Sequence, residues 1–143
     1  MKKETKVAIA EAVLTAAIIA IIVMSITGVF MFAVVEGKSM EPLLQTGDLV
    51  FVYRTDPHTI HEGDVVVYER PGRSFIIHRV IKVMEEDGKM YFIIKGDNNP
   101  VPDGAIPSEW ITGKVLSVGE ATLKIPGIGY LTLCLRSIFH AGS

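Results

Sequence analysis

Three short polar segments of the chain carry side chains that are typical of a hydrolytic site. The first, Gly37–Pro42, contains one serine, Ser39, and follows a long apolar run. The second, Ile77–Val80, contains His78, and the third, Lys95–Asn99, is rich in turn-forming residues. A hydroxyl, an imidazole and a carboxylate are the groups needed for acyl transfer through a serine nucleophile. The hypothesis is therefore that folding brings these three segments together.

His78 is the strongest candidate for the base, although its position also has a structural explanation. It lies in a strand-like pattern, with Ile76 and Val80 two positions away on the same face. A histidine on an apolar face is more often a satisfied core residue than a catalyst. However, the charged Arg79 and Lys82 indicate that this strand is not uniformly buried. Both interpretations stay open on composition and periodicity alone.

Asp97 and Asp103 are the candidate carboxylates, because both follow the strand that we expect to pair with the histidine strand. A carboxylate near His78 would hold the imidazole tautomer and stabilise the imidazolium. The alternative is that Asp97, with Asn98 and Asn99, only caps a turn through side-chain to backbone bonds. The sequence leaves these two interpretations about even.

The remaining histidines and the cysteine are interpreted as structural or surface residues. His58 and His61 lie in a polar connection without obvious further metal ligands, and His140 lies near the end of the chain. We therefore expect no metal and no other cofactor. Cys134 is the single cysteine, so no intrachain disulfide is possible, and its leucine neighbours predict a packed thiol.

The composition indicates one folded domain joined to a separate apolar segment. The 143 residues are enough for one domain, and 49% of them are hydrophobic, with the excess near the N-terminus. The net charge of −2 gives no support to nucleic-acid binding, which usually needs a clustered basic face. We therefore expect no nucleic-acid partner.

The apolar segment is Ala12–Val35, which has 24 residues and no charge. As a helix it would be about 36 Å long, more than the roughly 30 Å hydrocarbon core of a bilayer. The remaining domain could hardly surround a helix that is apolar on every side. A cleaved signal peptide would have a shorter apolar core and a small-x-small cleavage site, which Ala33–Gly37 lacks. We therefore predict an uncleaved anchor in membrane lipid.

The charges before the apolar segment predict the topology. Lys2, Lys3 and Lys6 favour a cytoplasmic N-terminus by the positive-inside bias. We expect a single-pass protein of the cell membrane, or of the endoplasmic-reticulum membrane in a eukaryote. Residues 1–35 would form the cytoplasmic N-terminus and anchor, and residues 36–143 the extracytoplasmic domain.

Short β-branched and aromatic runs predict that this domain is mainly β, compact and mostly antiparallel. Gly-Asp pairs precede two of the runs, and the Asp-Gly pair within Glu85–Lys89 predicts a hairpin. The expected strands are Leu49–Tyr53, Val65–Tyr68, Phe75–Met84, Met90–Lys95 and Gly113–Val118.

The apolar C-terminal tail, about residues 125–139, has several interpretations. It contains Pro126, Gly127 and Gly129, and it is too short to predict a second membrane span. It is compatible with a last strand, an interfacial helix or part of a second anchor. Of these, we favour contact with the membrane surface.

These motifs, taken in order, resemble three conserved boxes of type I signal peptidases. A histidine in the base box, where housekeeping bacterial enzymes have lysine, is similar to the endoplasmic-reticulum and archaeal branch of peptidase family S26, which also occurs in some Gram-positive bacteria. The resemblance covers about residues 10–118, and three boxes in order are a far more specific signal than any one alone. The boxes are Gly37–Pro42 with Thr46–Asp48 for the serine, Gly63–Val66 with Ile77–Val80 for the base, and Lys95–Asn99 with Asp103 for the acid.

The resemblance implies a membrane-anchored serine endopeptidase that removes N-terminal signal peptides from secretory and membrane preproteins after small residues. It implies that Ser39 is the nucleophile, forming an acyl-enzyme, and that His78 is the general base. Asp103 is the favoured triad carboxylate, with Asp97 also needed nearby, and the two roles are not separated. Many relatives have a serine two positions before the nucleophile, where this chain has Gly37. The oxyanion would then depend on backbone N–H groups, including that of Ser39.

The implied partners are preproteins bearing signal peptides, membrane lipid, and the protein-export channel or accessory subunits. Autocleaving repressor-type peptidases have a related β domain and a serine nucleophile. They pair that serine with lysine and carry a DNA-binding domain, and this chain has neither feature. The non-enzymatic alternative is a membrane-anchored β module that binds extracytoplasmic partners, with Ser39 and His78 as ordinary residues.

Overall fold

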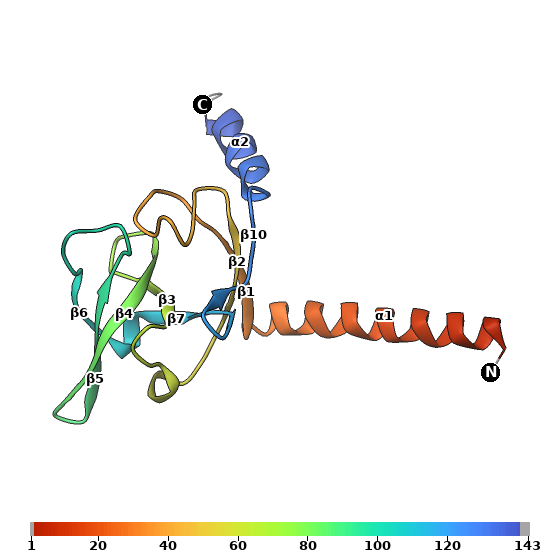
Figure 1. The fold of residues 1–143 in the computed structure, drawn as a ribbon, viewed down its shortest axis with the longest axis horizontal. Helices are drawn as coiled ribbons and strands as arrows, with labels where there is room; N and C mark the ends of the chain where they lie inside the picture. Colours follow the sequence, from red (N-terminus) through yellow and green to blue (C-terminus); the bar gives the residue numbers. More distant parts are fainter. Residues whose placement is uncertain (1, 141–143) are drawn as a thin grey trace. The chain divides into compact units, whose positions relative to one another are not determined.

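The computed structural model describes residues 2–140 and shows a long N-terminal helix, a β domain and a short C-terminal helix (Figure 1). The chain divides into two compact units, Met1–Met31 and Phe32–Ser143. The predicted fold class, a mainly antiparallel β domain on an N-terminal apolar helix, is confirmed. The elements are α1 (Lys3–Ile26), β1 (Phe30–Val34), β2 (Leu49–Tyr53), η1 (Pro57–Thr59), β3 (Val65–Glu69), β4 (Phe75–Glu86), β5 (Lys89–Lys95), β6 (Gly104–Pro107), η2 (Ser108–Trp110), β7 (Ile111–Val115), β8 (Ser117–Val118), β9 (Ala121–Thr122), β10 (Lys124–Ile125) and α2 (Gly129–His140).

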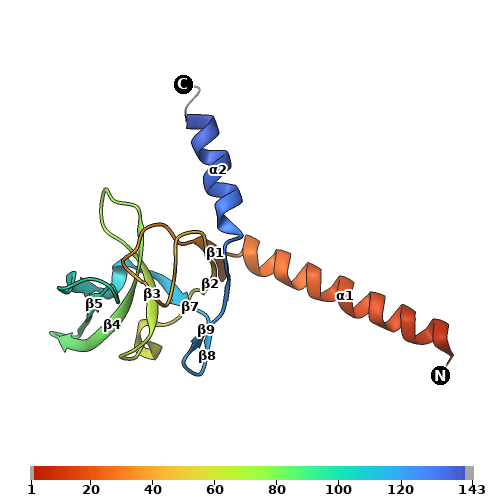
Figure 2. The same cartoon turned by 45° about the horizontal axis from the view of Figure 1, so that its top comes forward.

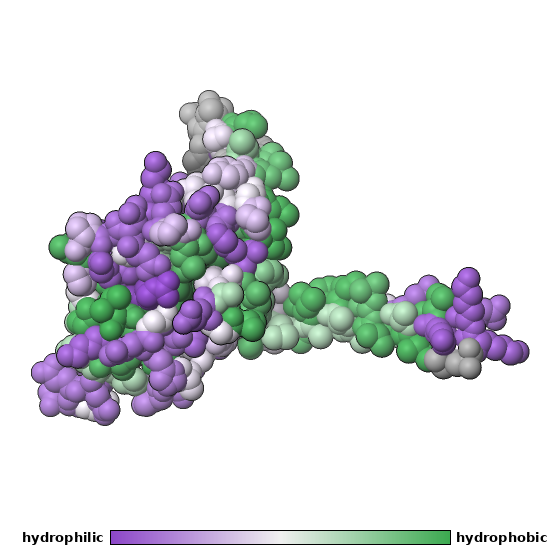
Figure 3. All heavy atoms as spheres, viewed as in Figure 1, coloured by the Kyte–Doolittle hydropathy of each residue, from purple (hydrophilic) through white to green (hydrophobic). Residues whose placement is uncertain are grey.

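Helix α1 is long and apolar enough to cross a bilayer. It has 24 residues, none of them buried within the protein, and its most apolar stretch has a mean hydropathy of 2.6. In the space-filling view it is hydrophobic along most of its length, with hydrophilic residues towards its N-terminal end (Figure 3). An apolar helix whose side chains are not buried needs an apolar solvent, which a membrane provides.

The helix ends before the uncharged run does. The N–H of Thr27 bonds to the carbonyl of Val23, and Gly28 adopts a left-handed φ of 69°, a common way for a helix to end. Residues Phe30–Val34 then form β1, where the predicted anchor was expected to continue to Val35. Because an apolar strand such as β1 and a membrane helix are both uninterrupted apolar runs, hydropathy alone does not place this boundary.

The β domain is one eight-stranded sheet with a small added hairpin. Its strand order is β1-β2-β7-β3-β4-β5-β6, with β10 also pairing with β2. The β8–β9 hairpin lies beside it, between β7 and β10 in the chain (Figure 2). All five predicted strands are present, although the one expected at 113–118 is divided between β7 and β8. The edge strand β6 was not predicted.

The β4–β5 hairpin confirms the Asp-Gly prediction. Glu86 pairs with Lys89, so Asp87 and Gly88 alone form the loop. Both have positive φ, 51° and 72°, which a two-residue turn of this kind requires. The hairpin joins β4, which carries His78, to β5, which leads into the segment Lys95–Asn99, called the acidic segment below.

The core of the domain lies between the central strands and the crossing connections. Its members are fully or almost fully buried apolar side chains that alternate along β3, β4 and β5. Burial of such side chains stabilises the domain by roughly 1.5–3 kcal/mol each. The cluster comprises Ile60, Val66, Tyr68, Val80, Phe92, Ile94 and Ile106.

The C-terminal tail forms both a strand and a helix, because β10 is followed by helix α2, and its contact with the membrane surface stays a prediction. Pro126 and Gly127 separate the strand from the helix. With 12 residues, α2 would be about 18 Å long, too short to cross a bilayer. Cys134 is exposed on this helix, so the prediction of a packed thiol was wrong. Apolar neighbours in the sequence do not show which face of a helix is packed, because adjacent residues of a helix point in different directions.

Candidate active site

Ser39 lies in the loop between β1 and β2, residues 35–48, which we call the serine loop. The two arms of the loop are joined at its base. Gly37 and Thr46 exchange hydrogen bonds between backbone and side chain at 3.0 and 3.1 Å, and the Val35 N–H bonds to the carbonyl of Asp48 at 2.9 Å. Ser39 itself is half-buried.

Two apolar side chains fix the serine loop from inside. Met40 and Leu44 are 1% and 0% exposed, and the Leu44 N–H bonds to the carbonyl of Met40. The residue directly after the serine is therefore an anchor in the core. This placement explains why a polar loop with two glycines can hold a defined conformation.

His78 lies in β4, between β3 and β5, and is 6% exposed. Its pair across the ladder in β3 is Val66, and Val80 lies further along its own face in the core. The imidazole Nδ1 contacts the carboxylate oxygen Oδ2 of Asp103. With Nδ1 engaged, Nε2 is the ring nitrogen that remains for another partner.

Asp103 is the centre of a buried polar cluster. It follows the turn after β5 and directly precedes β6, and its N–H bonds to the carbonyl of Ile94 at 2.7 Å. The Tyr68 hydroxyl donates to the same Oδ2 that contacts His78, at 2.8 Å. The Arg70 guanidinium donates to the backbone carbonyl of Asp103. Two side chains therefore contact the carboxylate, and two further bonds hold the backbone of Asp103.

Tyr68 is a functional candidate that the sequence reasoning missed. It is fully buried in β3, and burial together with its bond to Asp103 raises the pKa of its hydroxyl well above the usual value. The hydroxyl therefore stays protonated and remains a donor. The signal in the sequence was a tyrosine within an otherwise aliphatic buried run, because a buried tyrosine hydroxyl usually needs a polar partner.

Asp97 has a different partner. Its two carboxylate oxygens each accept a bond of 2.8 Å from the Arg79 guanidinium, which raises the pKa of Arg79. A third bond from Arg79 reaches the carbonyl of Gly63 at 2.8 Å. The structure therefore gives different partners to the two aspartates, whose roles the sequence did not separate. Asp103 contacts the imidazole of His78, and Asp97 bonds to Arg79, the next residue of the strand.

The acidic segment also contacts the serine loop directly. The N–H of Asn98 bonds to the carbonyl of Ser39 at 2.8 Å, and its side-chain amide bonds to the carbonyl of Lys38 at 3.1 Å. A Cβ on Gly96 would lie 2.7 Å from the Ser39 carbonyl oxygen, so only glycine permits this approach. Asn98 therefore does more than cap its own turn.

The strand register relates this contact to the histidine. Arg79 pairs with Lys95, and one further step of the antiparallel register places Gly96 beside His78. Because Gly96 also adjoins the Ser39 backbone, the serine loop, β4 and the acidic segment lie together. A cavity of about 490 Å³ adjoins Ser39, lined by Val34, Val35, Glu36, Ser39, Met40, Ser74, Phe75, Ile76, Ile77 and Arg136.

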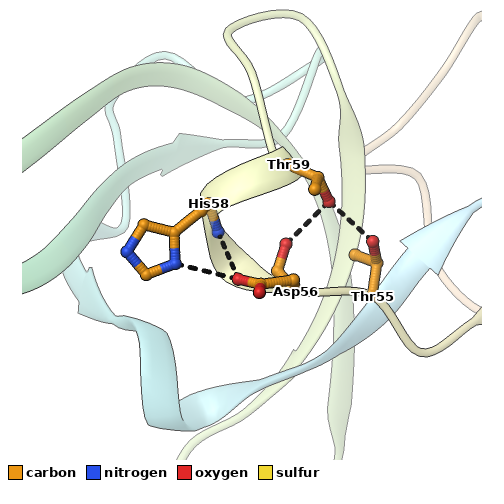
Figure 4. Close-up of polar contacts among 4 residues, drawn as sticks. All are labelled: Thr55, Asp56, His58 and Thr59. Carbon is orange, nitrogen blue, oxygen red and sulfur yellow. Dashed lines mark hydrogen bonds and ion pairs between the residues drawn. The ribbon is translucent and has the colours of Figure 1, made fainter.

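The remaining candidate ligands lie elsewhere. His58 and His61 are exposed, and the His58 ring bonds to Asp56 within the η1 turn (Figure 4). The side chain of His140 lies outside the described residues. Among the residues that the structure describes, no group of three or more His, Cys, Asp or Glu side chains is arranged to hold a metal ion.

Comparison with known proteins assigns the class. The model of the Peptidase S24-like family matches residues 5–116, and the chain belongs to that family. Two similar relatives are the human signal peptidase complex catalytic subunit SEC11C, 42% identical over 110 residues, and the Candida albicans (strain SC5314 / ATCC MYA-2876) signal peptidase complex catalytic subunit SEC11, 38% identical over 106 residues. The matches cover 72% and 71% of this chain, and 56% and 63% of the two relatives.

These relatives confirm the resemblance to signal peptidases of the endoplasmic-reticulum type. The chain spans only a little over half of the length of the human relative. The matched family region ends at residue 116, before β8, β9, β10 and α2.

Proposed function

We propose that the protein is a membrane-anchored serine endopeptidase that removes signal peptides from preproteins. The observation that carries this proposal is the buried His78–Asp103 contact beside a loop that presents a half-buried serine. The names of the relatives support the substrate class, because both are catalytic subunits of a signal peptidase complex.

In the proposed reaction, the Ser39 hydroxyl attacks the carbonyl carbon of the scissile peptide bond. His78 accepts the hydroxyl proton at Nε2, because its Nδ1 is held by Asp103. The carbonyl oxygen becomes an oxyanion that backbone N–H groups stabilise, in the absence of a serine at position 37. Collapse of the intermediate breaks the C–N bond as His78 protonates the leaving amine.

The second half of the reaction frees the serine. Water attacks the ester carbonyl of the acyl-enzyme, and His78 accepts a proton from that water. The ester bond then breaks, the proton passes to Ser39, and the signal peptide leaves with a new carboxylate. Asp103 keeps the imidazole oriented and stabilises its protonated form throughout.

The cavity next to Ser39 would receive substrate side chains near the cleaved bond. Its lining is mixed, with apolar side chains from β1 and β4 and the polar Glu36, Ser74 and Arg136. We propose that it accepts small residues before the cleaved bond, as signal-peptide cleavage sites require. The substrate would lie as an extended strand against a sheet edge.

The proposed location follows from α1. An uncleaved membrane helix with a cytoplasmic N-terminus would place the β domain outside the cytoplasm. Ser39 follows the end of the helix by only 13 residues, so the tether restricts the nucleophile to the neighbourhood of the membrane. Substrates anchored in the same bilayer then meet the site at a raised effective concentration. Accessory subunits and the export channel are proposed as further partners.

The direct test uses the full chain in detergent with one secretory precursor. We expect the parent protein to release a mature N-terminus, identified by mass spectrometry, and Ser39→Ala to lose at least about a thousandfold in rate. Ser117→Ala, in the exposed strand β8, is the control and should cleave like the parent. Equal rates for the parent and Ser39→Ala would overturn the proposal and favour a β module that only binds partners.

A further inference from the structure

The segment after the matched family region makes a set of contacts with the serine loop. We call residues 121–130, from β9 to the first turn of α2, the C-terminal strap. Strand β10 pairs with β2, directly after the serine loop, with Lys124 opposite Val50 and Ile125 opposite Leu49. The strap is thereby brought alongside the end of the loop.

Lys124 makes the central contact of the strap. Its ammonium group donates to the carbonyl of Leu43 at 2.8 Å and to the Asp48 carboxylate at 2.7 Å. Asp48 is only 3% exposed and also accepts from the N–H of Gln45 at 3.0 Å. One side chain of the strap thus holds the serine loop at two separate points.

The electrostatics of Asp48 indicate that this pair is favourable. Burial alone would raise the pKa of Asp48, but the N–H of Gln45, the Lys124 ammonium group and the N–H of Gly127 all act in the opposite direction. The pKa therefore lies below its usual range. The carboxylate is held ionised by the strap and by its own loop.

The strap also contacts Gly47 of the serine loop, in addition to the contacts made by Lys124. The N–H of Gly129 donates to the carbonyl of Gly47 at 2.8 Å. The Tyr130 ring lies against Gly47 so closely that a Cβ there would approach it to 2.5 Å. Gly47 also has a φ of 91°, so both its backbone conformation and the strap require glycine at this position.

These contacts reach Ser39 through the loop itself. The strap holds the arm at residues 43–48, and that arm is bonded to the other arm through Thr46 and Gly37. Ser39 is two residues beyond Gly37. A loop that loses the strap would keep its sequence and its buried methionine but would lose the restraint on the second arm.

We propose that Lys124 is a positioning residue of the peptidase: it clamps the serine loop through Asp48 and Leu43, so that Ser39 is presented to His78. This inference rests on the proposed function. It assigns a role to a part of the chain that lies beyond the family match at residues 5–116.

The test measures kinetics and local mobility in the full chain in detergent. We expect Lys124→Met to lower kcat at least tenfold, since a misplacement of about 1 Å can cost about a hundredfold. KM for a signal-bearing peptide should stay within about twofold of the parent, because Lys124 does not contact the substrate. The pH profile of kcat should shift by less than about 0.3 pH units, because Lys124 does not contact the imidazole. Amide hydrogen exchange should accelerate in residues 37–48 and not in β4 and β5.

Three further variants make the result decisive. Lys124→Arg keeps the charge and should recover most of kcat. Asp48→Asn with Lys124→Met leaves no unpaired buried charge, so it tests positioning even where Lys124→Met alone is poorly folded. Lys114→Met removes another strand lysine, which pairs with Asp64 at 2.7 Å, and should leave kcat within twofold.

The proposal is overturned if kcat of the folded double variant is within twofold of the parent, or if exchange in the serine loop is unchanged. Failure of the proposed function gives a different result, because the parent and Ser39→Ala would then cleave equally. The exchange measurement would still report whether the strap restrains the loop.

Discussion

In the part of the chain that the structure describes, two histidine–aspartate pairs join an imidazole Nδ1 to a carboxylate oxygen in different surroundings. In the η1 turn, His58 Nδ1 lies 2.9 Å from Asp56 Oδ1, and the two side chains are 76% and 65% exposed (Figure 4). In the sheet, His78 Nδ1 contacts Asp103 Oδ2, and the side chains are 7% and 18% exposed. The contact alone does not distinguish a surface pair from a candidate catalytic pair.

The difference lies in what else holds each carboxylate. Asp56 is two residues from its histidine and also accepts from the His58 N–H, so it acts as a local cap of a turn. Asp103 is 25 residues from its histidine and also accepts from a buried tyrosine. Water screens the first pair, whereas the interactions of the second are strengthened by burial. The candidate catalytic pair is therefore distinguished from the surface pair by its burial and by the buried side chain that also bonds to its carboxylate.

The largest expected effect separates the two histidines. His78→Ala should lower kcat at least about a thousandfold, because the proposed base is lost, whereas His58→Ala should leave kcat within twofold. The measurement is cleavage of one precursor by each folded variant at equal concentration. Comparable losses in both variants would mean that burial does not distinguish the pairs functionally.

The second expected effect separates the aspartates. Asp103→Asn should cost about 10²- to 10⁴-fold in kcat, because an amide cannot hold the imidazole in the same tautomer or stabilise its charge. Asp97→Asn should cost less, since its partner is Arg79 and the backbone bonds from Asn98 to the serine loop remain. The measurement is the single-turnover rate of each variant, with Asp56→Asn as the control. A larger loss in Asp97→Asn than in Asp103→Asn would show that Asp97 is the triad carboxylate.

Much of this arrangement could be predicted from the sequence. Five strands of the sheet, the Asp-Gly hairpin and the three segments that lie together were predicted, because period-two burial and turn chemistry are local signals. Periodicity did not choose the carboxylate that contacts His78, because both aspartates follow the same strand, and only the family resemblance favoured Asp103. Their partners, Tyr68 and Arg79, are defined only by strand register.

Two other features could not be predicted from the sequence, for different reasons. The end of α1 at Ile26 is set by Thr27 and Gly28, inside a run that hydropathy treats as continuous. The contact of Lys124 with Asp48 joins residues 76 positions apart through β10, a strand of two residues. A strand this short has no periodicity to detect, so only the folded sheet reveals its partner.

A smaller effect is expected from Tyr68→Phe, which removes one donor to Asp103 and keeps the ring. We expect kcat to fall about threefold to tenfold, less than the full strength of a hydrogen bond to a charged acceptor, because Asp103 keeps its contact with His78; KM should be unchanged. The pH profile gives a readout that packing does not. The Tyr68 hydroxyl and the imidazole share Oδ2 of Asp103, so losing the phenol should shift the acidic limb of kcat. Tyr91→Phe, in β5, is the control.

The raised pKa of Tyr68 also predicts that the stability of the folded protein depends on pH. The pKa of Tyr68 is raised in the folded protein, so the stability from keeping its phenol protonated is present below the ordinary value of 10.0. It is lost as the pH rises above that value. Urea unfolding between pH 8 and 11 should show a decline in the parent that is smaller in Tyr68→Phe. Identical declines in both proteins would remove Tyr68 as its source.

The smallest effect is expected at the exposed pair. The His58 N–H and then the His58 ring hold the pKa of Asp56 below its usual value of 3.8, so this carboxylate stabilises the turn above that pH. The contribution is lost as the pH falls through the lower pKa of the folded state. Asp56→Asn should therefore lower the Tm slightly at pH 7 and converge with the parent near pH 2, without a change in kcat. Because Asp56 is exposed and screened, a large loss of stability in this variant would show that the η1 turn supports more of the sheet than its own contacts indicate.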